Sequence, residues 1–363
     1  MKSVSLIGVQ RQTQAEYRDA IQALRQAPEQ GFQKLEQLGA IREVPYLERP
    51  QAVASAYREL TTDPNRKVLV VAGTHEEIGR ITHAIREGMK RSGDLGPGKT
   101  FERHTPLQWT EAQKKDLSNY QHGQVLLFHR SSHGIARNDA LVVERSGRSH
   151  IIARDLNGVE RFVSPTQARS FSVQERSQIE VSSGDRLLLT GNRREADFRA
   201  TNGELVKVRG IDGGRIQLDD GRTLPANYRE FDRGYAITAH RSQGKTVDAV
   251  VLSGDMMKQE QFYVAASRGR EGITVITSNV DQLRESLGIS TARPSATELA
   301  REQAHIGPAQ EHGLANPPTQ RIEPHRDGPV KSAIPLIQRR DSNDTQRTSL
   351  GSVQPGACAA DFR

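Results

Sequence analysis

The sequence has little of what small secreted proteins and membrane proteins rely on. Its single cysteine, Cys358, excludes an internal disulfide and a cysteine-rich zinc site. No run approaches the ~18 apolar residues that a membrane helix needs, and the first residues show no apolar secretory signal. Aromatic residues make up only 5% of the chain, and the mean hydropathy is −0.65. These absences predict a cytoplasmic protein without a membrane segment.

The charge balance is positive but modest. The 363 residues include 51 Lys or Arg and 44 Asp or Glu, a formal net charge of +7. This excess is compatible with a polyanionic partner and equally with ordinary solubility. The net charge alone therefore does not show whether the protein binds nucleic acid.

The last part of the chain, residues 291–363, differs in composition from the rest. It holds eight of the 16 prolines, one aromatic residue (Phe362) and no hydrophobic periodicity. A segment like this cannot bury enough apolar surface to offset its conformational entropy. It is predicted to be a disordered tail.

Two stretches have the pattern of an α/β domain. In the first, residues 1–120, a buried strand over 67–73 precedes a helix that Thr74 and Glu77 begin as a capping box. Thr13 and Glu16 have the same spacing ahead of an earlier amphipathic stripe. The second stretch, 233–290, holds strand patterns over 249–253 and 273–278, each followed by a helix pattern.

Between them, residues 121–232 predict antiparallel β-structure. Short apolar runs alternate with turn dipeptides such as Asn157-Gly158, Asn202-Gly203 and Asp220-Gly221. This spacing is typical of small barrels of the SH3-like kind, one or two of them. The predicted fold class is thus an α/β parallel-sheet domain interrupted by small antiparallel β-barrels.

Residues 93–100, GDLGPGKT, match the phosphate-binding pattern G-x-x-x-x-G-K-[ST]. That loop normally follows a buried strand and opens a helix, whose N-terminus faces the phosphates. Here a charged helical pattern precedes it and no helical stripe follows. We therefore interpret it as a surface loop and assign no ATP binding to Lys99.

The most informative residues are GYAITAHRSQGKTVDAVVLS and, after them, QFYVAASRGREGITVITS. They resemble motifs V and VI of superfamily 1 helicases, in the form found in conjugative relaxase–helicases (the TraI/TrwC-like, MobF family). SVSLIGVQRQTQAEYRDAIQAL resembles that family's segment with motif IV, and GDRLLLTGNRREADFRATNGELVKV its small barrel. The resemblance covers roughly residues 1–290.

The resemblance implies a role in ATP hydrolysis. In such helicases ATP and Mg²⁺ bind between two RecA-like domains, and arginines of the second domain reach the γ-phosphate. By similarity, Arg268 is the motif VI arginine finger and Arg11 the motif IV arginine, with Gln12 and Gly244 also at the nucleotide. An arginine's planar fork suits phosphate oxygens. The alternative for Arg268 is a helix-end arginine near the C-terminal dipole. Many relatives carry a ribose-binding carboxylate two residues after the motif V glycine, where this chain has Thr246.

The resemblance also implies single-stranded DNA as a partner. The residues it places at DNA are Thr74, His75, Thr238, His240, Ser242 and Gln243. Thr74 is equally explained as a helix cap. His129 and His133 lack further ligands at metal spacing, so no metal site is expected.

Taken together, the sequence predicts a truncated C-terminal helicase half of a conjugative relaxase, which acts in plasmid transfer. The recognisable Walker A and B motifs and the nicking domain are not found in it, so a missing N-terminal half is an expected partner. The isolated chain is expected to hydrolyse little or no ATP. The alternative is a non-enzymatic module that binds single-stranded DNA or another partner.

Overall fold

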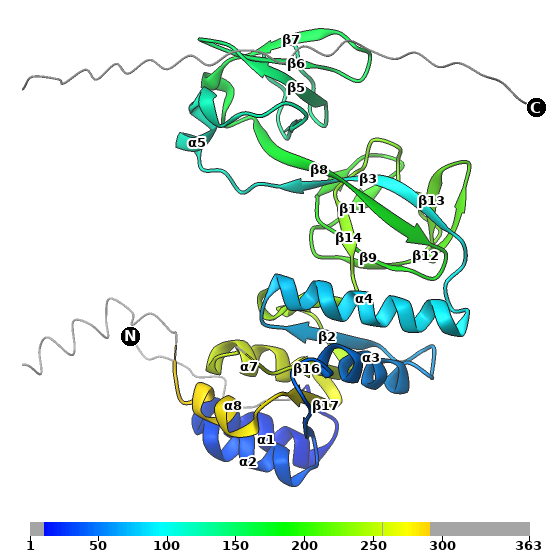
Figure 1. Ribbon diagram of the computed structural model, residues 1–363, viewed down its shortest axis with the longest axis vertical. Coiled ribbons are helices and arrows are strands. Elements are labelled where there is room, and N and C mark those ends of the chain that lie inside the picture. The colour runs from blue at the N-terminus through cyan, green and yellow to red at the C-terminus, as the bar shows by residue number, and fades with distance from the viewer. Residues whose placement is uncertain (1–10, 256, 291–363) are drawn as a thin grey trace, which may run out of the picture. The chain divides into compact units, whose positions relative to one another are not determined.

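A computed structural model describes residues 11–255 and 257–290, all within one compact unit, Met1–Ser295. The predicted disordered tail and Cys358 lie outside the described residues. The centre of the fold is a parallel sheet with the strand order β1-β17-β16-β2-β15 (Figure 1). Its strands are β1 (Ile41–Glu43), β2 (Val68–Ala72), β15 (Ala236–Thr238), β16 (Val247–Ser253) and β17 (Gly269–Thr277).

Helices cover both faces of this sheet, since its central strands alternate between two apolar cores. Leu69 and Val71 of β2 face the core formed with α1, α2, α7 and α8. Val68 and Val70 face the core formed with α3 and α4. The helices are α1 (Ala15–Gln26), α2 (Pro28–Gln37), α3 (Arg49–Leu60), α4 (His75–Ser92), α6 (Ala239–Ser242), α7 (Gln259–Ala266) and α8 (Val280–Leu287). The predicted α/β class, a parallel sheet combined with antiparallel sheets, is confirmed.

Helix α4 begins at the predicted cap, Thr74, but only half of the predicted capping box forms, because the Glu77 side chain bonds to Arg49, Ser253 and the N–H of Gly73. The Thr74 hydroxyl accepts a hydrogen bond from the backbone N–H of Glu77 (3.2 Å), and Gly93 ends the helix in the left-handed region at φ 78°. The capping box predicted at Thr13 is wrong. Helix α1 starts two residues later, and the Thr13 hydroxyl donates to the carbonyl of Arg270 (3.0 Å). A tertiary contact to β17 has replaced the local one.

The antiparallel part lies between α4 and β15 in the chain. A four-stranded sheet has the order β13-β12-β9-β14, and a six-stranded sheet the order β3-β8-β4-β5-β6-β7. The elements are β3 (Gly98–Pro106), α5 (Glu111–Lys115), η1 (Leu117–Asn119), β4 (Val125–Phe128), β5 (Ala140–Ser146), β6 (Ile151–Arg154), β7 (Glu160–Val163), η2 (Pro165–Gln167), β8 (Phe171–Ser182), β9 (Arg186–Leu189), β10 (Arg193–Arg194), β11 (Arg199–Ala200), β12 (Leu205–Asp212), β13 (Arg215–Leu218) and β14 (Phe231–Arg233).

The long strand β8 contributes to two separate apolar cores. Its first residues, Phe171 and Val173, pack with β4, β5 and β6. Its last residues, including Ile179 and Val181, pack with β9, β12 and β13. The structure thus has two small antiparallel modules that share β8, in agreement with the predicted antiparallel insertion.

The insertion starts earlier in the chain than residue 121. Strand β3 pairs along its whole length with β8, from Gly98 opposite Ser182 to Pro106 opposite Gln174. The sequence of β3, GKTFERHTP, is polar on both faces, and only Phe101 and His104 are buried. A strand without apolar alternation leaves no period-2 signal, which explains the difference.

A buried ion pair connects the insertion to α4. The Arg86 guanidinium donates to both carboxylate oxygens of Asp185, at 2.8 and 2.9 Å. Asp185 is fully buried and also accepts from the hydroxyl of Tyr235 (2.8 Å) and the N–H of Ser182 (2.7 Å). The guanidinium of Arg86 therefore compensates the buried charge of Asp185, and both carboxylate oxygens accept hydrogen bonds from protein donors.

Candidate nucleotide and DNA interface

The residues predicted to meet nucleotide come together at the start of β17. Arg11 donates from Nη1 to the carbonyl of Ser267 (2.8 Å), and Arg268 donates from Nη2 to the hydroxyl of the same serine (2.9 Å). Arg268 also donates from Nε to the carbonyl of Val264 (2.7 Å). Two guanidinium groups from opposite ends of the described chain thus meet at the C-terminal end of α7.

The pair is electrostatically unusual because like charges are placed side by side. Burial, and next the neighbouring charge of Arg11, lower the pKa of the half-buried Arg268 guanidinium. Burial and the charge of Arg11 both disfavour the protonated form of Arg268, and an anion bound between the two arginines would compensate their positive charges. The same contacts also cap the carbonyls of the last turn of α7, so the alternative role as helix-end arginines is fulfilled as well.

Gln12 supports this pair instead of facing a ligand. It is 2% exposed, and its Nε2 donates to the carbonyls of Ser267 (3.2 Å) and Gly269 (2.8 Å). Its Oε1 is buried without a hydrogen-bond partner. Gln12 therefore holds the segment of Arg11 against the segment of Arg268, a positioning role that differs from the predicted nucleotide contact.

Gly244 lies in the exposed loop that leads into β16. Its φ of 79° is in the left-handed region, and a Cβ there would meet nothing within 4 Å. Glycine is required here because of this backbone conformation and not because a side chain would lack space. Three residues later the N–H of Val247 donates to the carbonyl of Arg268 (3.1 Å), so this loop and the arginine pair share one edge of the sheet.

Four of the predicted DNA contacts lie at the opposite, carboxyl-terminal edge. β2 and β15 are parallel neighbours, with Thr238 opposite Ala72. Thr74 caps α4 after β2 and His75 is its first residue, while His240 lies in the short helix α6 that directly follows β15. Thr74, His75 and His240 are exposed, and Thr238 is half-buried. The topology thus brings together two helix starts that are far apart in the sequence.

The two remaining predicted DNA contacts differ from each other. Gln243 is exposed at the end of α6. Ser242 is fully buried, and its hydroxyl donates to the carbonyl of Ala239 (2.6 Å). A direct DNA contact of Ser242 is incompatible with this arrangement, because the short helix α6 turns its side chain inward.

The GDLGPGKT segment has no phosphate-loop geometry. Gly93 ends α4, and Lys99 lies within β3 opposite Val181. An antiparallel strand follows where a helix N-terminus would be needed. The structure supports the interpretation that Lys99 is not a Walker A lysine.

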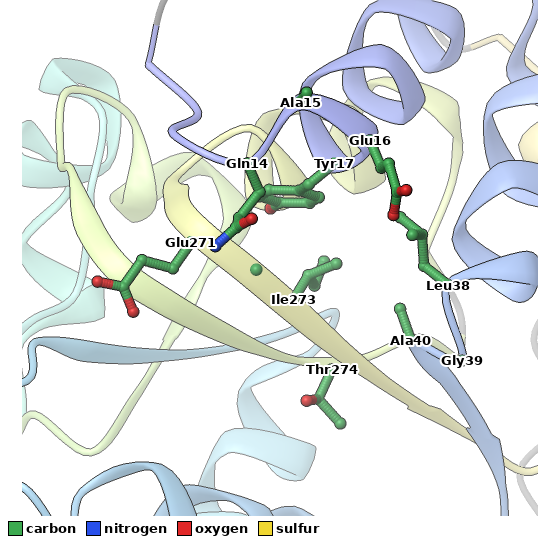
Figure 2. A pocket seen from close by; sticks show the side chains of 11 residues that line it. Gln14, Ala15, Glu16, Tyr17, Leu38, Gly39, Ala40, Glu271, Ile273 and Thr274 are labelled. Carbon is green, nitrogen blue, oxygen red and sulfur yellow. The ribbon is translucent and has the colours of Figure 1, made fainter.

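A cavity of about 510 Å³ lies beside the start of α1, as Figure 2 shows. It is lined by Tyr17, Ile273 and Thr274, among others, and neither Arg11 nor Arg268 belongs to its lining. The Tyr17 hydroxyl donates to the carbonyl of Ala266 (2.5 Å), and burial raises the pKa of this phenol. The lining of the cavity includes the acidic Glu271 and no basic side chain, so the cavity does not suit a phosphate ligand.

The histidines His129 and His133 are both exposed and lie against oxygen atoms of neighbouring residues. His129 Nε2 lies 2.9 Å from the carbonyl oxygen of Arg169, and His133 Nδ1 lies 3.0 Å from the Ser132 hydroxyl. Burial lowers the pKa of His129. Within residues 11–255 and 257–290, no group of three or more His, Cys, Asp or Glu side chains is arranged to hold a metal. Over the same residues, no helix combines the length and apolar character needed to cross a bilayer.

The sequence patterns missed a buried charge cluster at the carboxyl-terminal edge. Arg49, 4% exposed, forms ion pairs with Glu77 of α4 and with Asp255 after β16. Ser253 donates to Glu77 (2.5 Å), and Thr277 donates to Asp255 (2.6 Å). An arginine beside Pro50 in a first helical turn was the available signal, but its partners are distant in sequence.

Comparison with known proteins gives a weak structural likeness. Neither a protein-family model nor a curated protein matches the chain. Bacteroides Pif1 bound to ssDNA is similar at 14% identity and a TM-score of 0.30, over 82% of this chain and 55% of that one. Pif1 helicase from Bacteroides with ADP-AlF3 and ssDNA is similar at 15% identity and a TM-score of 0.28, over 82% of this chain and 55% of that one. Pif1 helicase from Candida albicans is similar at 13% identity and a TM-score of 0.27, over 80% of this chain and 58% of that one.

The chain spans little more than half the length of these solved structures. TM-scores this low carry no argument about activity. The fold assignment rests on the chain's own parallel sheet and its two helical layers.

Proposed function

We propose that this chain is the second RecA-like half of an ATP-dependent translocase on single-stranded DNA, of the conjugative relaxase–helicase type. Arg268 and Arg11 would complete an ATP·Mg²⁺ site whose phosphate-holding loop belongs to a partner RecA-like domain. The loops after β2 and β15 would contact DNA. The observation that carries the proposal is the meeting of Arg11 and Arg268 at Ser267.

The chemistry of this pair supports phosphoryl transfer in particular. Charge builds up on the transferred phosphoryl group, and a guanidinium from a second domain stabilises it. Arg268 and Arg11 keep donors beyond the ones used on Ser267 and Val264, since an arginine has five N–H groups. The chain alone offers cations for this step but no recognised loop to hold the phosphates, so its own turnover should be minimal.

The test is DNA-stimulated ATP hydrolysis with the purified chain, alone and mixed with a separately produced first RecA-like domain of a relaxase–helicase. Turnover is expected only in the mixture. Turnover of the chain alone that disappears in Lys99→Ala would overturn the proposal, because the phosphate loop would then lie at residues 93–100. Arg91→Ala, at an exposed position late in α4, is the matched control for loss of one positive charge.

The second candidate function is a non-enzymatic module that binds single-stranded DNA. The exposed loops at Thr74 and His240 favour it, since they need no nucleotide. Both candidates require binding that weakens steeply with salt, because phosphate contacts release counterions. If an oligonucleotide does not bind even at low ionic strength, both fail; if it binds but the mixture has no ATPase activity, the module remains.

A further inference from the structure

The loop between β1 and α3 exposes two consecutive apolar residues. Tyr46 is 49% and Leu47 82% exposed. This loop follows the carboxyl end of β1, at the same sheet edge as the loops after β2 and β15. Exposed apolar side chains that lie together, unlike single ones, can form part of a binding surface.

The Tyr46 ring is held by two arginines from two helices. The guanidinium carbon of Arg49 lies 4.9 Å from the ring centroid, and that of Arg80 lies 5.4 Å from it. Arg80 also donates from Nη2 to the Tyr46 hydroxyl (2.9 Å). Half of the side chain nevertheless remains open to solvent.

The support beneath the ring is rigid because Arg49 is fixed on both sides. Its ion pairs with Glu77 and Asp255 are buried, and both carboxylates have further hydrogen-bond donors at the ends of β16 and β17. A side chain fixed in advance loses little entropy when a ligand stacks on it. Nothing in the packing of the core requires Tyr46 to be aromatic.

The charges around the ring are largely compensated. Glu77 is paired with Arg49 and Glu76 with Arg80 at 3.3 Å, while Glu48, two residues after Tyr46, is exposed. Thr74 and His75 lie exposed just before Arg80 on the same helix segment. An aromatic platform beside hydroxyl, imidazole and guanidinium groups is the combination that binds single strands without sequence preference.

We propose that Tyr46 is a stacking platform for a base of single-stranded nucleic acid, with Leu47 against its neighbour. This inference rests on the proposed function, because it assumes that a single strand runs along this edge. It adds a residue that none of the helicase motifs contains, and it assigns base contact to Tyr46 and phosphate contact to the loop of Thr74.

The test compares two fluorescent probes of equal length at low salt, oligo-dT and an abasic oligonucleotide that keeps only sugar and phosphate. The wild-type chain is expected to prefer oligo-dT. Tyr46→Ala should weaken oligo-dT binding about 5- to 100-fold, the range for loss of one base–aromatic stack, and leave abasic binding unchanged. Tyr46→Phe should keep the preference, and so should the control Leu38→Ala, which removes another exposed apolar side chain.

A second measurement avoids variants altogether. Oligo-dT with one 5-iododeoxyuridine is irradiated on the wild-type chain, and the cross-linked peptide is identified by mass spectrometry. A cross-link at Tyr46 supports the inference. Three results overturn the inference and leave the proposed function standing: salt-sensitive binding with equal affinity for both probes, an affinity of Tyr46→Ala for oligo-dT equal to that of wild type, or cross-links only at other residues. No binding of either probe by wild type overturns the proposed function too.

Discussion

At the scale of single residues, function depends on where a few polar side chains are held. Arg11 and Arg268 are positioned by main-chain carbonyls at the end of α7, and Gln12 fixes their two segments to each other. The side chain that does the fixing is fully inside the protein. A residue next to a functional motif can therefore matter through geometry alone.

Gln12→Ala tests this positioning role. The substitution removes both donors from the carbonyls of Ser267 and Gly269 and is expected to cost about 1–3 kcal/mol of unfolding free energy, as for other buried groups left unpaired. Urea unfolding measures it. Gln14→Ala, at an exposed position without a side-chain cap bond, should change stability by less than about 0.5 kcal/mol. Equal effects of the two changes would contradict the role given to Gln12.

At the scale of secondary-structure elements, the fully buried ion pair between Arg86 and Asp185 supports the joint between α4 and the insertion, next to the more exposed pairs of Arg86 and Lys90 with Glu180. Arg86→Met leaves the fully buried Asp185 without its cation and is expected to cost about 3–5 kcal/mol. Adding Asp185→Asn removes the unpaired charge, while the amide oxygen can still accept from the Ser182 N–H and the amide NH2 can donate to the Tyr235 hydroxyl. The double variant should therefore be more stable than Arg86→Met alone. Urea unfolding that shows additive losses would refute the ion pair as the joint.

The strand β3 carries a pH-dependent element. Burial lowers the pKa of His104, while Glu102 at 3.0 Å opposes the shift. The unfolded imidazole takes up a proton near pH ~6.5, and the folded one only at lower pH. His104 thus contributes stability fully above that value and loses it as pH falls toward the folded pKa.

His104→Gln should therefore flatten the pH dependence of stability. The fall in unfolding free energy between about pH 7.5 and about pH 5.5, either side of the ordinary histidine pKa, is expected to be smaller in the variant. An identical fall in both proteins would show that His104 titrates as in water. His133→Gln, at an exposed loop position, serves as the control.

Elements with local signals were predictable and those with distant partners were not. The cap of Thr74, the turns at Asn157-Gly158 and Asn202-Gly203 and the valine-rich strands all appear as expected. The Thr13 hydroxyl is used in a tertiary contact with Arg270, while the Ser242 hydroxyl turns back to the carbonyl of Ala239 within α6. Tyr46 left no sequence pattern, and Arg49 left only its place beside Pro50, since their partners come from segments that meet only at the sheet edge.

At the scale of the whole molecule, the parallel sheet separates two chemistries. The arginine pair and the Gly244 loop lie at the edge where β16 and β17 begin, and the loops with Thr74, Tyr46 and His240 lie where the strands end. One rigid sheet thus connects the predicted nucleotide side with the predicted DNA side. Such a connection is what a motor needs if hydrolysis at one edge is to move a strand at the other.

The most direct test of this account is DNA-stimulated ATP hydrolysis by the chain mixed with a first RecA-like domain, comparing wild type with Arg268→Ala and Arg268→Lys. The account predicts that both variants lose turnover, Arg268→Ala by about 10³-fold or more, the range for a missing arginine finger. Single-stranded DNA binding should change little, and urea unfolding measures separately what the loss of the contacts with Val264 and Ser267 costs. Turnover that survives in Arg268→Ala would contradict the central claim.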